Sequence, residues 1–273
     1  MVQVFSKSCI GYSHILKQKP CQDFSSRYVD PKRIIITCCD GHGGDMYVRS
    51  DRGSAYASCA LINVFSSISK ITTKMCSNDE LVNKIRLEIL CEWNKLVERE
   101  LGTFPLRKKE VEFLDDDKKE FLKLNPVKAF GTTLSGALLI GNKLILASIG
   151  DTEVIGIRKG EIISLLSSED DPAGNITYSM CQEDAYDYLR VEVHDFNDYD
   201  GIILCTDGLT SPYQTYENFK DSFVKPLVNK IINDESINSI DAFIEDLAMN
   251  KGVGDDVSLS FIIKDNAFKK YYS

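Results

Sequence analysis

The chain of 273 residues carries 32 basic and 41 acidic residues, which gives a formal net charge of −9. This balance argues against a nucleic-acid partner, because neutralising phosphates needs clustered Lys and Arg. Hydrophobic residues make up 43% of the sequence and charged residues 27%, an ordinary composition that excludes a disordered chain. The first residues do not have the pattern of a signal peptide, and no apolar run reaches about 18 residues, so we expect no membrane span.

The nine cysteines are scattered along the chain without a CxxC spacing. The adjacent Cys38 and Cys39 would point to opposite faces of a strand, which is poor geometry for a disulfide. We therefore expect reduced, buried thiols and a cytoplasmic protein.

In chain order, the first third predicts two strands and two helices. The β-branched run RIIITCC indicates a buried strand, and apolar residues at helical spacing indicate the helices. The predicted elements are a strand at 2–8, a turn-rich stretch at 11–20, a strand at 33–39, and helices at 46–70 and 79–101.

Residues 102–128 change in character, because most of them are charged and their apolar stripe is sparse. This composition predicts a solvated helix or a lid, with specific partner binding as the alternative.

The second half of the chain returns to strands. Short turns at Gly141-Asn142 and Lys159-Gly160 join successive apolar runs, and this spacing predicts a four-stranded meander over 131–166. The predicted elements are strands at 131–140, 143–149, 153–158, 161–166, 189–193, 201–205 and 257–263, and helices at 216–232 and 237–249. With no internal repeat and no long linker, we expect one α+β domain over residues 1–273, with a large antiparallel sheet component.

Aspartate stands beside glycine at the end of an apolar strand in four places: Cys39-Asp40-Gly41, Ile149-Gly150-Asp151, Thr206-Asp207-Gly208 and Gly254-Asp255-Asp256. Asp and Gly are both unfavourable in strands, so this arrangement costs stability. A tight turn explains any single Asp-Gly pair. Four together predict carboxylates that converge on hard cations such as Mg²⁺ or Mn²⁺, and two such ions can activate a water and clamp a phosphoryl group.

The string DGHGGD at residues 40–45 is the most informative. Gly41 leaves its carbonyl free to approach a cation, and Gly43 and Gly44 permit a sharp exit into the next helix. The imidazole of His42 could protonate a departing serine alkoxide. A structural hydrogen bond is the alternative for this histidine, and His14 and His194 lack such a setting.

The ordered set CQDF (21–24), DGHGG (40–44), GTTLSGALL (131–139), ASIGDT (147–152), CTDGL (205–209) and GDDVSL (254–259) covers almost the whole chain. In this order the motifs resemble the type 2C metal-dependent serine/threonine protein phosphatases. CQDF, SDRGS (50–54) and DDPAGNITYS (170–179) look closer to the bacterial branch of that family. The resemblance implies two antiparallel sheets in a β-sandwich flanked by helices, in α-β-β-α layers, with a metal centre at one edge.

The resemblance also implies roles for individual residues. Asp40 matches the aspartate that bridges two metals, and Gly41 the residue that lends its carbonyl to one of them. Further roles follow by position: Asp207 and Asp255 as ligands of the other metal, Asp23 as an acid that holds metal-bound water, Asp151 as a ligand of a third ion in many members, and His42 as the general acid. The implied mechanism is direct attack of a metal-bridging water on phosphorus.

Three departures from the family pattern stand out. Gln22-Asp23 replaces Glu-Asp, so one outer carboxylate has become an amide. Lys17 and Lys19 stand where some members carry an arginine that grips the phosphate, and a lysine supplies charge without a bidentate fork. Ordinary loop charges are the alternative for these two lysines. Asp256 stands where Asn is frequent, and we take Asp255 as the ligand and Asp256 as its neighbour.

The resemblance thus implies an enzyme that hydrolyses phosphoserine or phosphothreonine with two Mg²⁺ or Mn²⁺ ions and acts on a phosphorylated protein. We expect a monomer without a nucleic-acid or membrane partner. One alternative is a catalytically inactive relative that binds partners, since a fold does not imply activity. Another is a phosphatase of a small phosphorylated metabolite.

Overall fold

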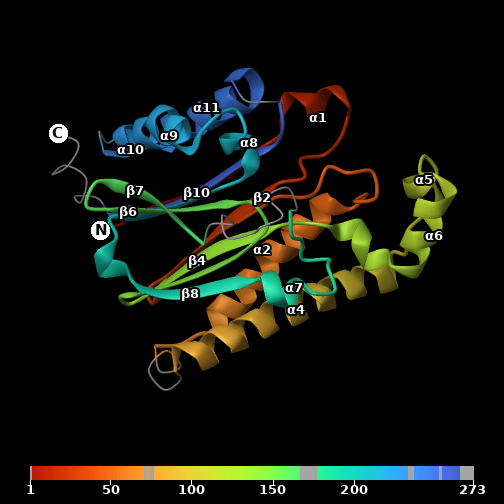
Figure 1. Cartoon of the computed structure of the whole chain (residues 1–273), viewed down its shortest axis with the longest axis horizontal. Helices are drawn as coiled ribbons and strands as arrows, with labels where there is room; N and C mark the ends of the chain where they lie inside the picture. Colours follow the sequence, from red (N-terminus) through yellow and green to blue (C-terminus); the bar gives the residue numbers. More distant parts are fainter. Residues whose placement is uncertain are drawn as a thin grey trace.

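The structure is a computed structural model that describes residues 2–70, 73, 77–166, 177–232, 237–251 and 254–264. Its ten named strands form two five-stranded antiparallel sheets (Figure 1). The first sheet has the order β1-β10-β9-β6-β7 and the second the order β2-β3-β4-β5-β8. The strands are β1 (Val2–Cys9), β2 (Phe24–Asp30), β3 (Arg33–Cys39), β4 (Leu134–Ile140), β5 (Lys143–Ile149), β6 (Glu153–Arg158), β7 (Glu161–Leu165), β8 (Arg190–Asp195), β9 (Gly201–Cys205) and β10 (Val257–Lys264).

Helices cover the outer face of each sheet, as Figure 1 shows. The helices that cover the second sheet are α2 (Ser50–Ser67) and α4 (Asn78–Thr103). Those on the first sheet are α9 (Tyr216–Phe219), η3 (Lys220–Val224), α10 (Lys225–Ile232), α11 (Ile237–Asp246) and η4 (Leu247–Lys251). Shorter helices are α1 (Tyr12–Leu16), α5 (Lys108–Val111), α6 (Asp116–Leu124), η1 (Pro126–Phe130), α7 (Ala185–Tyr188), η2 (Phe196–Asp198) and α8 (Asp207–Thr210).

Three apolar clusters hold these layers together. Alternation along β3 sends Ile36 and Cys38 into the space between the sheets, while Ile35 and Cys39 face α2 and α4. Trp93 of α4 is fully buried in the cluster between the second sheet and its helices. Its indole donates a hydrogen bond to the Gly53 carbonyl at 3.1 Å. The expected α-β-β-α sandwich is therefore confirmed, as are the opposite faces of the two adjacent cysteines.

The predicted four-stranded meander is wrong. β4 pairs with β5 in one sheet, whereas β6 and β7 pair in the other, so the chain changes sheets between Ile149 and Glu153. Gly150 has a φ of +96°, a left-handed conformation that glycine adopts without strain. The change of sheet places Asp151 at the edge between the two layers.

The other differences concern short or polar elements. β2 was not predicted; it is an edge strand whose residues are exposed or half-buried. The five-residue helix α1 was not predicted either and lies inside the stretch expected to be turns. Cys59 and Cys91 are exposed rather than buried, although every cysteine in the described part of the chain is free.

Residues 102–128, the segment expected to be a charged helix or lid, contain the end of α4, the helices α5 and α6, and the start of η1. They extend from the end of α4 at one side of the molecule (Figure 1). The side chain of Arg49 is 2% exposed and forms a bidentate pair with Glu110, at 3.0 and 3.1 Å. Arg49 also donates to the carbonyls of Phe104 and Pro105, at 2.7 and 3.1 Å. Across the described residues, no helix has the length and apolar character needed to cross a membrane.

Candidate metal centre

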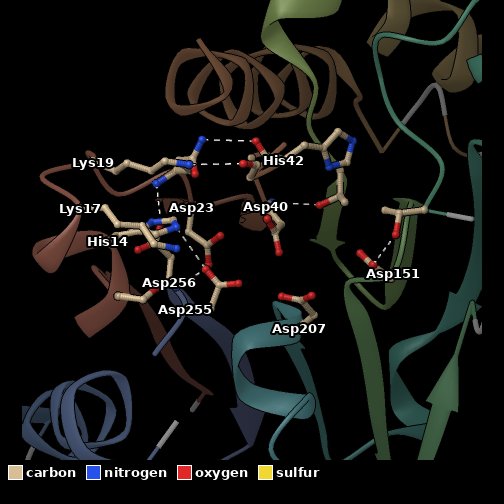
Figure 2. Close-up of a pocket in the computed structure, with 16 residues that line it drawn as sticks. His14, Lys17, Lys19, Asp23, Asp40, His42, Asp151, Asp207, Asp255 and Asp256 are labelled. Carbon is tan, nitrogen blue, oxygen red and sulfur yellow. Dashed lines mark hydrogen bonds and ion pairs between the residues drawn. The ribbon is translucent and has the colours of Figure 1, made fainter. Parts of the chain in front are cut away.

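Strand ends from both sheets meet around one cavity of about 330 Å³. Figure 2 shows the carboxylates of Asp40, Asp207 and Asp255 around its centre, with Asp151 on one side and Lys17 and Lys19 on the other. All the residues predicted for the site line this cavity, which is walled by Ser13, His14, Lys17, Lys19, Gln22, Asp23, Asp40, Gly41, His42, Gly43, Thr133, Asp151, Thr177, Asp207, Asp255 and Asp256.

Asp40 is held at the end of β3 by two threonines of the GTT motif. Thr133 accepts a hydrogen bond from the Asp40 amide at 2.9 Å, and its own amide donates to the Asp40 carbonyl at 2.8 Å. The Thr132 hydroxyl donates to the same carbonyl at 2.7 Å. These bonds fix the backbone of Asp40 and leave its carboxylate facing the cavity.

Gly41 is required by its close neighbours. A Cβ atom at this position would lie 2.5 Å from the Gln22 carbonyl oxygen and 2.7 Å from that of Ser50. Both obstacles are backbone atoms, which cannot rotate away as a side chain can. The chain can therefore run close beside the cavity only with glycine at this position.

Burial and mutual repulsion destabilise the charged forms of the central aspartates. Burial is the largest cause that raises the pKa of Asp40, followed by the charges of Asp23 and Asp207. Burial likewise raises the pKa of Asp207, although its hydrogen bond with Asp40 acts in the opposite direction. Burial also raises the pKa of Asp23, against a hydrogen bond of 2.7 Å from the Thr206 hydroxyl to its Oδ2.

Asp255 and Asp256 differ sharply in their surroundings. The side chain of Asp255 is 53% exposed and that of Asp256 only 3%. Asp256 accepts hydrogen bonds from the amides of Gly11 and Gln22, at 2.8 and 2.6 Å. This contrast supports the prediction that Asp255 faces a ligand and that Asp256 is its neighbour.

The remaining carboxylate, Asp151, is exposed and accepts a hydrogen bond of 2.7 Å from the Thr177 hydroxyl. Thr177 was not predicted as a site residue. Nothing in its sequence pattern marks it, because it reaches Asp151 from a segment 26 residues further along the chain.

His42 lies on the cavity wall between the glycines of DGHGG. Its amide donates to the Gly131 carbonyl at 3.1 Å, and its ring meets that of Tyr47 edge-on at 4.9 Å. Burial lowers the pKa of His42, and the nearby charge of Asp151 raises it by a smaller amount. Its free imidazole is therefore biased toward the neutral form.

The loop at residues 17–22 brings amine and amide groups to the cavity. Lys19 Nζ donates to the Gly43 carbonyl at 3.3 Å, and Lys17 is exposed. Gln22 Nε2 donates to the Ser50 hydroxyl and to the His42 carbonyl. Its Oε1 is buried without a hydrogen-bond partner within the described residues, so it is an acceptor that a bound ligand or its waters could satisfy.

The carboxylates share a cavity but do not form a ready-made ligand set. In the part of the chain that the structure describes, no group of three or more His, Cys, Asp or Glu side chains is placed to hold a metal ion. Mg²⁺ does not require such a cage, since it keeps several waters and binds through one or two carboxylates together with substrate phosphates. The all-oxygen donors and the unpartnered Gln22 Oε1 fit a hydrated hard cation.

His14 was not predicted as a site residue, because its neighbours in the sequence lack a pattern like that around His42. The structure places it in the cavity wall, 2.8 Å from Asp256 and 3.5 Å from Asp255. It lies more than 240 residues before these carboxylates in the chain, so no local spacing could reveal the contact.

A family model described as Protein phosphatase 2C matches residues 10–245, and no curated protein matches the sequence. The chain is similar to a bacterial serine phosphatase at 17% identity, over 96% of this chain and 98% of that chain, with a TM-score of 0.63. It is also similar to the serine/threonine phosphatase PstP/Ppp of Mycobacterium tuberculosis, at 18% identity over 97% and 99% of the two chains, with a TM-score of 0.56. A third similar structure is the PstP catalytic domain in complex with two manganese ions, at 18% identity over 96% and 97%, with a TM-score of 0.55. The structural likenesses show the fold, and the family match extends over most of the sequence. The chain belongs to the protein phosphatase 2C family.

Proposed function

We propose that this protein is a metal-dependent phosphatase that hydrolyses phosphoserine and phosphothreonine in proteins. The observation that carries the proposal is the convergence of Asp40, Asp207 and Asp255 on one cavity, with His42 and two lysines on its walls. Family membership and the serine/threonine phosphatases among the similar structures support it. All three carboxylates are retained, which argues against a binding-only relative.

In this proposal, two Mg²⁺ or Mn²⁺ ions would be held by Asp40, the Gly41 carbonyl, Asp207 and Asp255. Asp23 would order their waters, and Asp151 would offer a weaker outer position. The similar structure with two manganese ions supports this number and type of ion. When bound, the ions would lower the pKa of a water and neutralise charge on the phosphoryl group.

The remaining residues act on the substrate. Lys17 and Lys19 provide positive charge at the cavity edge, where they would attract the phosphate dianion and orient it. His42 would donate a proton from its imidazole to the departing serine or threonine oxygen. Burial lowers the pKa of His42, and a phosphate dianion bound beside the ring would raise that pKa and favour the protonated form.

Comparing turnover of a phosphothreonine peptide with that of free phosphoserine tests the substrate class. A protein phosphatase should have a clearly higher kcat/KM for the peptide, and Asp207→Asn should abolish both reactions while the fold survives. Preference for free phosphoserine would favour a metabolite phosphatase. Full activity in Asp207→Asn would contradict the proposed centre.

A further inference from the structure

His14 stands between two carboxylates of the candidate centre. It lies in α1 and is 7% exposed. Its Nδ1 is 2.8 Å from Asp256 Oδ2, and its Nε2 is 3.5 Å from Asp255 Oδ1. Figure 2 shows the ring beside this pair of aspartates, on the side of the cavity that carries the lysines. The contact with Asp256 is a hydrogen bond, and the contact with Asp255 is a longer ion-pair contact.

The Asp256 carboxylate is already occupied by the protein. Its Oδ1 accepts from the Gly11 amide at 2.8 Å, and its Oδ2 accepts from the Gln22 amide at 2.6 Å as well as contacting His14. With 3% of its side chain exposed, it has both oxygens engaged by groups of the protein. Asp256 instead joins the two ends of the loop 11–22 to the start of β10.

Further contacts make this attachment rigid. The Ser13 amide donates to the Gly254 carbonyl at 2.8 Å. A Cβ atom on Gly11 would lie only 2.1 Å from the carbonyl carbon of Asp255, so the two backbones are in direct contact. His14 is thus carried on a segment whose position relative to residues 254–256 is fixed by its backbone.

Asp255, in contrast, has one engaged and one open oxygen. Within the described residues, its polar contacts come from the Asp256 amide at 2.9 Å and from His14 Nε2, and both reach Oδ1. Oδ2 is left for the cavity, which Asp255 lines with a half-exposed side chain. A carboxylate held through one oxygen presents the other in a defined direction.

We propose that His14 is a positioning residue for the cation site: it fixes the Asp255 carboxylate by linking it to the buried Asp256. The inference rests on the proposed metal-dependent function and assigns no contact between His14 and substrate or metal. Groups that hydrogen-bond to metal ligands restrict the ligand's orientation, and their loss typically weakens metal affinity by about 10- to 100-fold. We expect an effect of this size when the Asp255 contact is lost.

Two substitutions separate the two contacts of His14. In His14→Asn the amide nitrogen takes the place of Nδ1, so the Asp256 contact is kept and the Asp255 contact is lost. In His14→Gln the amide nitrogen takes the place of Nε2, which reverses the pattern. His194→Gln serves as a matched control, because His194 lies on β8, pairs with Glu192 and Tyr199, and does not line the cavity.

The experiment titrates metal-free protein with Mn²⁺, follows free Mn²⁺ by electron paramagnetic resonance, and measures the melting temperature in EDTA. His14→Asn should weaken Mn²⁺ binding by about 10-fold or more with little change in the metal-free melting temperature. His14→Gln should retain most of the affinity but melt earlier, and the control should match the unaltered protein.

Unchanged Mn²⁺ affinity in His14→Asn would overturn the inference, because His14 would then serve the fold alone. Equal loss of affinity in both variants, in proportion to their loss of stability, would overturn it as well. If the unaltered protein binds no Mn²⁺, the proposed metal centre fails and this inference fails with it. Binding by the unaltered protein therefore distinguishes the two failures.

Discussion

At the scale of single residues, the site concentrates negative charge where water is scarce. Asp40, Asp23 and Asp207 all have raised pKa values, and burial is the first cause in each case. A protein keeps such an arrangement at a cost to its stability unless a cation compensates it. The perturbed acids are thus the residue-scale signature of a functional centre.

His42→Ala tests the proposed general acid. Turnover of a phosphothreonine peptide should fall by about 100-fold or more, the usual contribution of a positioned acid. An aryl phosphate such as p-nitrophenyl phosphate should be affected much less, because its leaving group needs no proton. Steady-state rates on both substrates measure the difference, and equal losses would contradict the assigned role.

At the scale of elements, several apolar strands were predicted with correct bounds, whereas the polar edge strand β2 was missed. β3, β5 and β9 were predicted with the bounds that the structure has, because each is a short run of mostly apolar, buried residues. β2 was missed because its sequence FSSRYVD lies at a sheet edge and alternates poorly. The meander was predicted wrongly because turn spacing does not reveal that a chain changes sheets.

The segment 102–128 is joined to the rest of the molecule by Arg49 and Glu110. Hydrogen bonds from Arg49, more than any other influence, lower the pKa of Glu110 to about 2. An acid whose pKa is lowered on folding stabilises the folded protein at pH values above its pKa in the unfolded chain, which is about 4.3 for Glu. This contribution is lost as the pH falls through about 2.

Glu110→Gln should therefore lower the free energy of unfolding at pH 7 by about 1 to 3 kcal/mol, since it leaves the buried Arg49 short of a charged partner. It should also increase proteolysis within residues 104–124. The difference in the free energy of unfolding between the variant and the unaltered protein should have its full size at pH 6. It should shrink at pH values below about 4. Glu112→Gln, at an exposed position, is the control. A difference that does not change with pH would contradict the ion-pair account.

At the scale of the whole molecule, the two sheets bring residues from distant parts of the chain to one end of the sandwich. The convergence of the acids at strand ends on one cavity could be predicted, because tight turns explain a single Asp-Gly pair but not four of them beside apolar strands. The pairing of His14 with Asp255 and Asp256 could not, since it depends on how loop 11–22 lies against the start of β10. The role of Lys17 and Lys19 also depends on where that loop lies.

The most direct test of the account measures phosphate release from a phosphothreonine peptide with Mn²⁺, with Mg²⁺ and with EDTA. We predict release that requires a divalent cation and disappears in Asp40→Asn, while thermal melting shows that the variant is folded. A folded, unaltered protein that releases no phosphate with either metal, or one that remains active in EDTA, would contradict the assignment of this cavity as the centre of a metal-dependent phosphatase.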